Sequence, residues 1–182
     1  MLPLAHLGIG SNLVRPWWKK LDLRALLFGT LLPDLIDKPL YHVPALLTGL
    51  HGYELGLISG TRSVAHSLLF LGLLLLFALV PGGRRRWWLS VAVGVATHLL
   101  LDNGPEALNE LSPYSGRIAL LFPYFGWRFP LAKNHSMAEH FLSHLEVFDL
   151  CGEVVGAALL AWMWKARTRP TRGDGRPAST EA

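Results

Sequence analysis

The sequence predicts an all-α integral membrane protein, a helical bundle with about three full transmembrane helices and two shorter N-terminal apolar helices. Hydrophobic residues make up 51% of the 182 residues and charged residues only 16%, whereas soluble domains usually carry about a quarter charged residues. The stretch Ser63–Val80 contains no lysine, arginine, aspartate or glutamate. Basic residues stand beside tryptophans at the ends of apolar stretches, as they do where helices leave a bilayer.

The two shorter apolar helices are expected at the N-terminus. Pro3–Val14 is apolar but interrupted by glycines, and Arg15–Lys20 (RPWWKK) is typical of a helix end at a membrane surface. Leu21–Leu32 is the second short helix, and Pro33 is expected to end it. Tyr41–Thr61 is mixed and glycine-rich, so we interpret it as loop with room for one surface helix.

The full transmembrane helices are expected further along the chain. As a helix, Ser63–Val80 would be about 27 Å long, close to the ~30 Å of the hydrocarbon core. Trp87–Leu101 follows a basic turn and is its expected antiparallel partner. Asn103–Lys133 is rich in proline, glycine and tyrosine and too polar to span. The capping-box pattern Ser136–Glu139 predicts the start of a helix that runs to Trp164.

The domain organisation is simple. Residues 1–164 are expected to form one membrane-embedded domain, and residues 165–182 a disordered basic cytoplasmic tail. The single cysteine, Cys151, excludes an internal disulfide and a thiolate-rich metal site. The net charge of +4 is concentrated in loops and tail, so no nucleic-acid partner is expected. The oligomeric state stays open.

Metal-competent side chains gather at one predicted membrane face. Basic clusters mark the cytoplasmic helix ends by the positive-inside tendency, and the segments then alternate across the bilayer. Six side chains fall at the opposite, non-cytoplasmic ends of four segments: His6, Asp34, Asp37, His66, His98 and Asp102. This shared placement predicts a metal site at the non-cytoplasmic face.

The ligand types indicate the kind of metal. His98 and Asp102 lie one helical turn apart on one face. Histidine and carboxylate ligands without cysteine suit zinc, manganese, nickel or iron and favour a catalytic site. Zinc is the expected ion, manganese or another transition metal is an alternative, and six ligands leave room for one or two ions. Asp34 or Asp37 would bridge a pair of ions.

Two residues are candidates for catalytic roles. Arg62 precedes His66 by four residues and could bind a phosphate or a developing oxyanion. Each site residue also has an ordinary explanation, such as a helix-end histidine or a turn with two solvated acids. His66 is harder to explain in this way, because an unpartnered imidazole inside an apolar run is costly at membrane depth.

A second polar cluster is expected on the last helix. Its members are His140, His144, Glu139, Glu146, Asp149 and Glu153. These residues either complete the metal site or pair with Arg62 and Arg117, and we favour the pairing.

The assembled motifs resemble those of a known family. The counterparts here are His6; Pro33, Asp34, Asp37 and Pro39; Arg62, His66 and Ser67; and Gly94, His98 and Asp102. Over about residues 1–130 the sequence resembles the bacterial YdjM-like (LexA-regulated) membrane-bound metal-dependent hydrolases. Their pattern has an N-terminal His, a PDxDHP turn, an HRGxTHS motif and a GxxSHxxxD helix end. The sequence departs from it where Thr61 replaces the first motif histidine and where Asp37 follows Asp34 by three positions instead of two.

The resemblance implies a multi-pass protein of the bacterial inner membrane that hydrolyses a small-molecule, lipid or phosphoester substrate. Phosphoester chemistry is favoured by a distant likeness to helical zinc-dependent phospholipases C and nucleases. The alternative is a non-enzymatic membrane protein with a structural or transported metal ion. A transporter would hold its ligands near the middle of the membrane on discontinuous helices, whereas these residues are predicted near helix ends.

Overall fold

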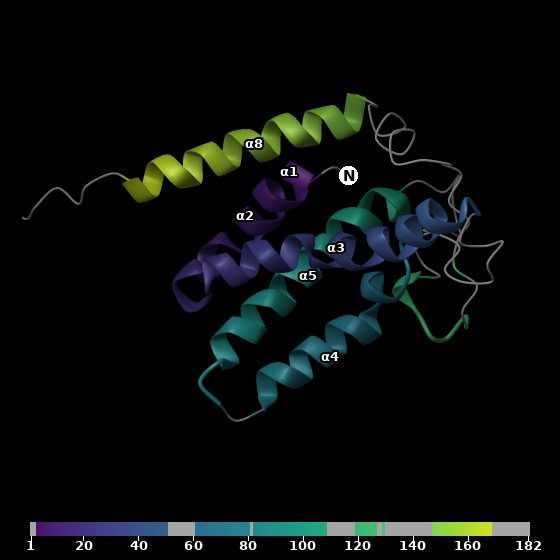
Figure 1. The fold of residues 1–182 in the computed structure, drawn as a ribbon. Helices are drawn as coiled ribbons and strands as arrows, with labels where there is room; N and C mark the ends of the chain where they lie inside the picture. The colour runs from purple at the N-terminus through teal and green to yellow at the C-terminus, as the bar shows by residue number, and fades with distance from the viewer. Residues whose placement is uncertain are drawn as a thin grey trace, which may run out of the picture.

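The computed structural model describes residues 3–50, 61–80, 82–108, 119–126, 129 and 147–168. All regular structure within these residues is helical, which confirms the predicted all-α class. Helices α3 (Leu23–Thr48) and α5 (Arg85–Leu108) cross at the centre of the molecule, and α4 (Leu68–Leu79) packs beside α5 (Figure 1). Helix α8 (Val147–Thr168) lies across the N-terminal helices.

The predicted full transmembrane helices are not found in this part of the chain. None of its described helices combines the length with the apolar character that crossing a bilayer requires.

The N-terminal apolar segment is short and helical, as predicted. It consists of α1 (Pro3–Ala5), the π-helical turn η1 (His6–Gly10) and α2 (Ser11–Leu13). The 3₁₀ turn η2 (Arg15–Lys20) then leads into α3.

Two predictions about helix α3 are wrong. The helix continues through Pro33, where its end was expected, and through Tyr41, where a loop was expected to begin. It begins at an N-cap, where Asp22 Oδ1 accepts a hydrogen bond from Ala25 N at 3.0 Å. It ends at Gly49, which has a left-handed φ of 71° that glycine adopts without strain. An internal proline costs a helix about 3 kcal/mol, and the burial of α3 against α5 offsets that cost here. Residues 51–60 of the predicted loop lie outside the described residues.

The predicted helix Ser63–Val80 is shorter in the structure. Helix α4 has 12 residues, about 18 Å at the usual rise per residue. A 3₁₀ turn, η3 (Val64–His66), precedes it, and Ser67 Oγ caps α4 by accepting a hydrogen bond from Phe70 N at 3.1 Å. Helix α4 begins later than predicted because the N–H groups of Ser63 and Ala65 donate hydrogen bonds to the carboxylate of Asp37 on α3. These residues therefore do not continue the helix.

The last two helices also differ from prediction at their ends. Helix α5 extends past Leu101 to Leu108, so the expected polar excursion begins inside a helix. Helix α8 extends past Trp164 to Thr168, so the first four residues of the expected tail are helical. The predicted helix start at Ser136–Glu139 and the rest of the tail, residues 169–182, lie outside the described residues.

Helices α3 and α5 touch through their backbones. A Cβ atom added to Gly94 would clash with the carbonyl of Leu26, and one added to Gly29 would clash with that of Val91. Small residues allow this approach, as in membrane helix pairs. The buried apolar cluster around the contact consists of Ala25, Leu74, Val91, Ala92, Val95 and Leu99. Beyond this contact, the residues of α3 that follow Gly29 lie beside the residues of α5 that follow Gly94.

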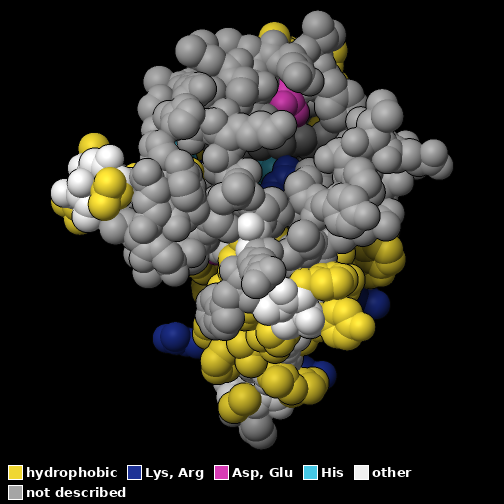
Figure 2. Space-filling model, turned by 90° about the vertical axis from the view of Figure 1, so that its right-hand side faces the viewer, with side chains coloured by type: hydrophobic (Ala, Val, Ile, Leu, Met, Phe, Trp, Pro, Cys, Tyr) yellow, Lys and Arg dark blue, Asp and Glu magenta, His cyan; other side chains and the backbone are white. Residues whose placement is uncertain are grey.

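Helix α4 leaves much of its apolar surface uncovered. Its exposed large side chains are Leu68, Leu69, Leu73, Leu75, Leu76, Phe77 and Leu79. Figure 2 shows hydrophobic side chains over the lower half of one face of the molecule.

Candidate metal centre

Four segments bring five of the six predicted ligands into one cluster: His6 from η1, Asp34 from α3, His66 from η3, and His98 and Asp102 from α5. The three imidazoles and Asp102 are buried, and the Asp34 side chain is 13% exposed. Two triads among these residues could each hold a metal ion, namely His6, His98 and Asp102, and Asp34, His66 and His98. The sixth residue, Asp37, is buried behind His66.

The tautomer of His98 is fixed by the backbone of α3. His98 Nδ1 lies 2.7 Å from the carbonyl oxygen of Thr30 and must donate a proton to it, because a carbonyl can only accept. Pro33, one turn along, leaves the neighbouring carbonyl of Gly29 without a helical donor, which opens the backbone at this turn. His98 Nε2 therefore carries a bare lone pair in the neutral ring.

Asp37 fixes His66 in the same way. Asp37 Oδ2 lies 2.7 Å from His66 Nδ1 and also accepts a hydrogen bond from Ser63 N, while Oδ1 accepts one from Ala65 N. A carboxylate partner makes Nδ1 the protonated nitrogen of His66. Both oxygens of Asp37 are thus used to shape η3 and orient His66. Asp37 therefore has the placement of a residue that supports a candidate ligand, and its role as a ligand or a bridge stays a prediction.

The two bare nitrogens face each other. His66 Nε2 and His98 Nε2 are 3.1 Å apart, and two lone pairs at this distance repel unless a proton or a metal cation lies between them. Two imidazoles on one tetrahedral zinc ion, with Zn–N bonds of 2.0–2.1 Å, hold their nitrogens about 3.3 Å apart. The observed separation therefore fits a shared metal ion.

Carboxylate oxygens approach the same point. Asp34 Oδ1 lies 3.6 Å from His66 Nε2, and Asp102 Oδ2 lies 3.6 Å from the Nε2 atoms of both His66 and His98. Such distances are too long for hydrogen bonds but suit neighbouring ligands around one ion. Lys38, one turn after Asp34, forms a 2.6 Å ion pair with its other oxygen. The donor set is therefore two imidazoles and two carboxylates.

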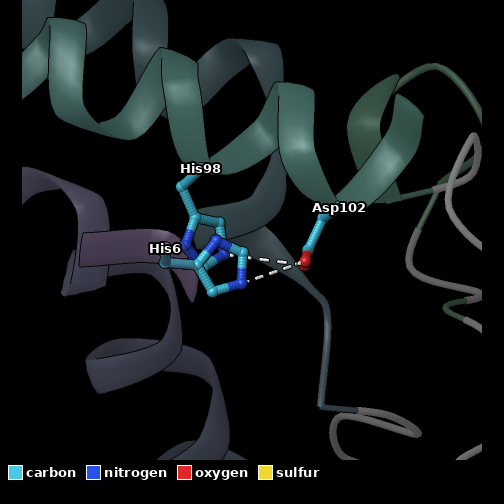
Figure 3. Close-up of side chains that lie close together, drawn as sticks. All are labelled: His6, His98 and Asp102. Carbon is cyan, nitrogen blue, oxygen red and sulfur yellow. Dashed lines mark ion pairs between the residues drawn. The ribbon is translucent and has the colours of Figure 1, made fainter. Parts of the chain in front are cut away.

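His6 lies beside His98 and also contacts Asp102. Its ring stacks on His98 with 4.0 Å between centroids, and its Nε2 is 3.2 Å from Asp102 Oδ1 (Figure 3). Within the described residues, neither buried nitrogen of His6 has a hydrogen bond of good geometry, which is unusual for a buried imidazole. The two oxygens of Asp102 face different imidazoles, so Asp102 also has the placement of a bridging carboxylate, and the bridging role of Asp34 or Asp37 stays a prediction.

The carboxylates are held in their charged form. Burial alone would raise the pKa of Asp102, but the charge of Arg62 and contacts with three imidazoles hold this pKa well below its usual value. For Asp34, burial again raises the pKa, and contact with His66 and the charge of Lys38 lower it below the usual range. Anionic oxygens are the form that binds a cation.

Arg62 lies at the edge of the cluster. Its Nε is 3.2 Å from Asp102 Oδ2, and its side chain is 27% exposed. The position fits the predicted contact with an anionic group, although Arg62 also pairs with a candidate ligand.

Comparison with known proteins then identifies the family. A family model described as YdjM inner membrane protein matches residues 1–169. The chain belongs to the YdjM inner membrane protein family. This confirms the resemblance drawn from the motifs, and the family description indicates an inner membrane protein. No curated protein and no solved structure matches the chain significantly.

Glu153 has a different role in this YdjM-family chain from the one predicted. Its carboxylate accepts hydrogen bonds from the N–H groups of Leu4, at 3.1 Å, and Ala5, at 2.9 Å. It therefore caps the first helix, whereas a pair with Arg62 or Arg117 was favoured from the sequence. Asp149 is half-buried in the first turn of α8, and the other predicted members of this cluster, Glu139, His140, His144 and Glu146, lie outside the described residues, as does Arg117.

Three contributors to the site were missed in the sequence. Thr30 acts through its backbone carbonyl, which no side-chain pattern reveals. Lys38 stands four residues after Asp34, a helical pair that would have been visible if α3 had been predicted to continue through Pro33. Gly29 was not singled out, although its backbone contact with α5 sets the distance between the ligands.

Proposed function

We propose that this YdjM-family protein is a membrane-bound metal-dependent hydrolase that acts on a lipid or phosphoester substrate. One observation carries the proposal, namely the Nε2 atoms of His66 and His98, 3.1 Å apart beside two carboxylates of low exposure. Two facing lone pairs repel unless a proton or a metal cation lies between them, and the adjacent carboxylates favour a cation there.

Some residues of the site would bind the metal ion, and others would orient those ligands. Asp34, His66, His98 and Asp102 would hold one divalent ion, with zinc expected and manganese as the alternative. His6 and the second oxygen of Asp102 would hold part of the shell of a second ion. When bound, such an ion polarises water, which supplies a hydroxide nucleophile at neutral pH.

The remaining residues would prepare the site. Asp37 and the carbonyl of Thr30 each accept a hydrogen bond from Nδ1 of a ligating imidazole, which directs Nε2 of each neutral ring towards the ion. Arg62, partly exposed beside Asp102, would bind the negative charge of a phosphoester and of its transition state. The rest of the site excludes water through burial.

We further propose a multi-pass placement in the inner membrane with the site towards the non-cytoplasmic face. The family description and the uncovered apolar side chains of α4 support an apolar surrounding. Single cysteines in a Cys151→Ala background test the orientation. Tyr124→Cys, exposed near the site end, should be labelled by an impermeant reagent in intact cells, and Arg85→Cys at the other end should not. The reverse pattern would place the site in the cytoplasm.

Metal analysis of the purified protein is the first test of function. We expect at least one equivalent of a transition metal in the wild type, and loss of this metal in His98→Ala and in Asp102→Asn. His42→Ala removes a histidine of α3 outside the cluster and should keep the metal. A wild-type protein without metal, even after incubation with zinc or manganese, would refute the site.

Turnover is tested separately with bis(p-nitrophenyl) phosphate and with phospholipid vesicles. Arg62→Ala should retain the metal but lose most of its hydrolysis, because the lost contact is with substrate charge. Metal-loaded wild type that hydrolyses neither probe would favour the alternative, a protein with a structural or transported ion.

A further inference from the structure

A second pocket lies at the end of α3 and α5 that is remote from the metal centre. It has a volume of about 530 Å³ and lies between η2, the starts of α3 and α5, and the C-terminal half of α8, on the left of Figure 1. Its polar and aromatic lining includes Trp18, Lys19, Asp22, Arg24 and Arg86. Arg86 stands 12 residues before His98 on α5, which corresponds to about 18 Å along the helix. The pocket is therefore a separate site.

The pocket carries an excess of positive charge. Lys19, Arg24 and Arg86 line it together with a single carboxylate, that of Asp22. Asp22 is already engaged, because its Oδ1 caps α3 by accepting a hydrogen bond from Ala25 N at 3.0 Å. Within the described part of the chain, none of the three cations forms an ion pair with an aspartate or glutamate. An anion entering the pocket would meet three cationic groups.

The walls of the pocket are held in place. Nη2 of Arg86 donates hydrogen bonds to the carbonyl oxygens of Lys19, at 3.1 Å, and of Leu21, at 2.7 Å. Trp18 Nε1 donates to the carbonyl oxygen of Ser11 at 2.8 Å, which orients the indole ring. The turn η2 is thus tied to both α5 and α2, and the cations of the pocket project from a fixed frame.

We propose that this pocket binds the phosphate group of an anionic phospholipid. Arginine and lysine bind phosphate through charge-assisted hydrogen bonds, and basic pockets between membrane helices are sites for anionic headgroups. Two features favour a lipid over a free phosphate. The exposed Trp17 beside the pocket is a residue type enriched at the membrane interface, and the chain belongs to an inner membrane family.

Native mass spectrometry of the detergent-purified protein with phosphatidylglycerol or phosphatidylcholine of the same acyl chains tests the proposal. We expect a phosphatidylglycerol adduct that forms at a lower lipid concentration than the phosphatidylcholine adduct. In Lys19→Gln/Arg24→Gln, the apparent affinity for phosphatidylglycerol should fall about 25-fold, the product of two roughly five-fold losses. Both side chains are exposed, so folding should be unchanged, and Arg24→Gln alone is the second variant if the double one is unstable.

The matched control is Lys20→Gln/Arg85→Gln. It removes two exposed charges from the same end of the molecule without touching the pocket lining. We expect less than a three-fold loss. Equal losses in both double variants would show a general effect of surface charge and would overturn the proposal.

A competition experiment distinguishes a lipid headgroup from free phosphate as the ligand. Inorganic phosphate at millimolar concentration should displace phosphatidylglycerol only weakly, because it lacks the acyl chains and the surrounding apolar contacts. Saturable binding of inorganic phosphate that depends on Lys19 and Arg24, without preference for phosphatidylglycerol over phosphatidylcholine, would overturn the lipid as ligand.

Discussion

The candidate metal centre has two halves that are held in different ways. Helices α3 and α5 carry Asp34, His98 and Asp102 and meet through long, backbone-close contact inside the buried apolar cluster. The N-terminal segment α1–η1–α2 carries His6 and has no member in that cluster. It packs on α8, through the carboxylate of Glu153 and a backbone contact between Gly8 and Gly156, and its turn η1 also contacts α3 and α5.

The difference predicts unequal stability for the two halves. Burial of apolar surface by two helices of 26 and 24 residues makes α3–α5 the stable unit. The N-terminal helices α1 and α2 have three residues each, too short to be stable alone. Short segments that pack on neighbouring helices open at lower free energy than the long helices of the core. Loss of His6 should therefore cost less stability than loss of His98 or Asp102, which lie on the core helix α5.

The largest effect is expected from Gly94→Val in the α3–α5 contact. The new side chain would clash with the backbone of α3 at Leu26, and we expect a loss of roughly 4 kcal/mol or more in the free energy of unfolding. Thermal unfolding in detergent and the yield of folded protein measure it. Gly72→Val is the matched control, because a Cβ atom there meets no neighbour within 4 Å. Equal stability of the two variants would show that the α3–α5 contact is not the stable unit.

Gly156→Ala should disturb the N-terminal half while leaving α3–α5 folded. The added methyl group would meet the carbonyl of Leu4 and push α8 away from the segment that carries His6. We expect metal affinity to fall about 10- to 100-fold, as for the loss of a supporting residue, with a small change in helix content by circular dichroism. Gly152→Ala, one turn earlier on α8, makes only an ordinary 3.5 Å contact with Ala5 and should bind metal like the wild type.

The predictable part of the site is its residue set. His66, His98 and Asp102 are polar groups next to apolar runs, where burial without a partner is costly, and this makes them visible in the sequence. Helical periodicity placed His98 and Asp102 on one face, and the structure brings them together as expected. The class of the fold followed from composition in the same way.

The unpredicted part depends on contacts between distant segments. Pro33 predicts a helix end locally, and only packing of α3 on α5 overrides it. Asp37 was grouped with the ligands because a carboxylate next to a ligand motif has the same local signature whether it binds a metal or a neighbouring histidine. Glu153 looked inward-facing, but its partners are backbone N–H groups about 150 positions earlier, which carry no side-chain signal.

Glu153→Gln should weaken the N-terminal half by less than Gly156→Ala. Glutamine keeps the shape but has one oxygen acceptor for the two N–H groups of Leu4 and Ala5, and it has no charge to favour the helix N-terminus. Loss of a hydrogen bond to a charged group costs about 1.5–3 kcal/mol. Hydrogen exchange at Ala5 should quicken while exchange in α5 stays the same. Faster exchange in both segments would mean that the two halves unfold together and do not differ in stability.

The smallest effect is expected from Ser67→Ala, which removes the N-cap of α4 next to His66. Loss of a serine cap costs about 1 kcal/mol, so the midpoint of thermal unfolding should fall by a few degrees. Metal affinity should change less than three-fold, because the Nδ1 atom and the backbone N–H of His66 are both bonded to Asp37, and Ser67 touches neither. Ser67→Thr keeps a hydroxyl acceptor for Phe70 N and should restore the midpoint. A large loss of metal in Ser67→Ala with full recovery in Ser67→Thr would instead place the support of His66 in the cap of α4, outside the α3–α5 half.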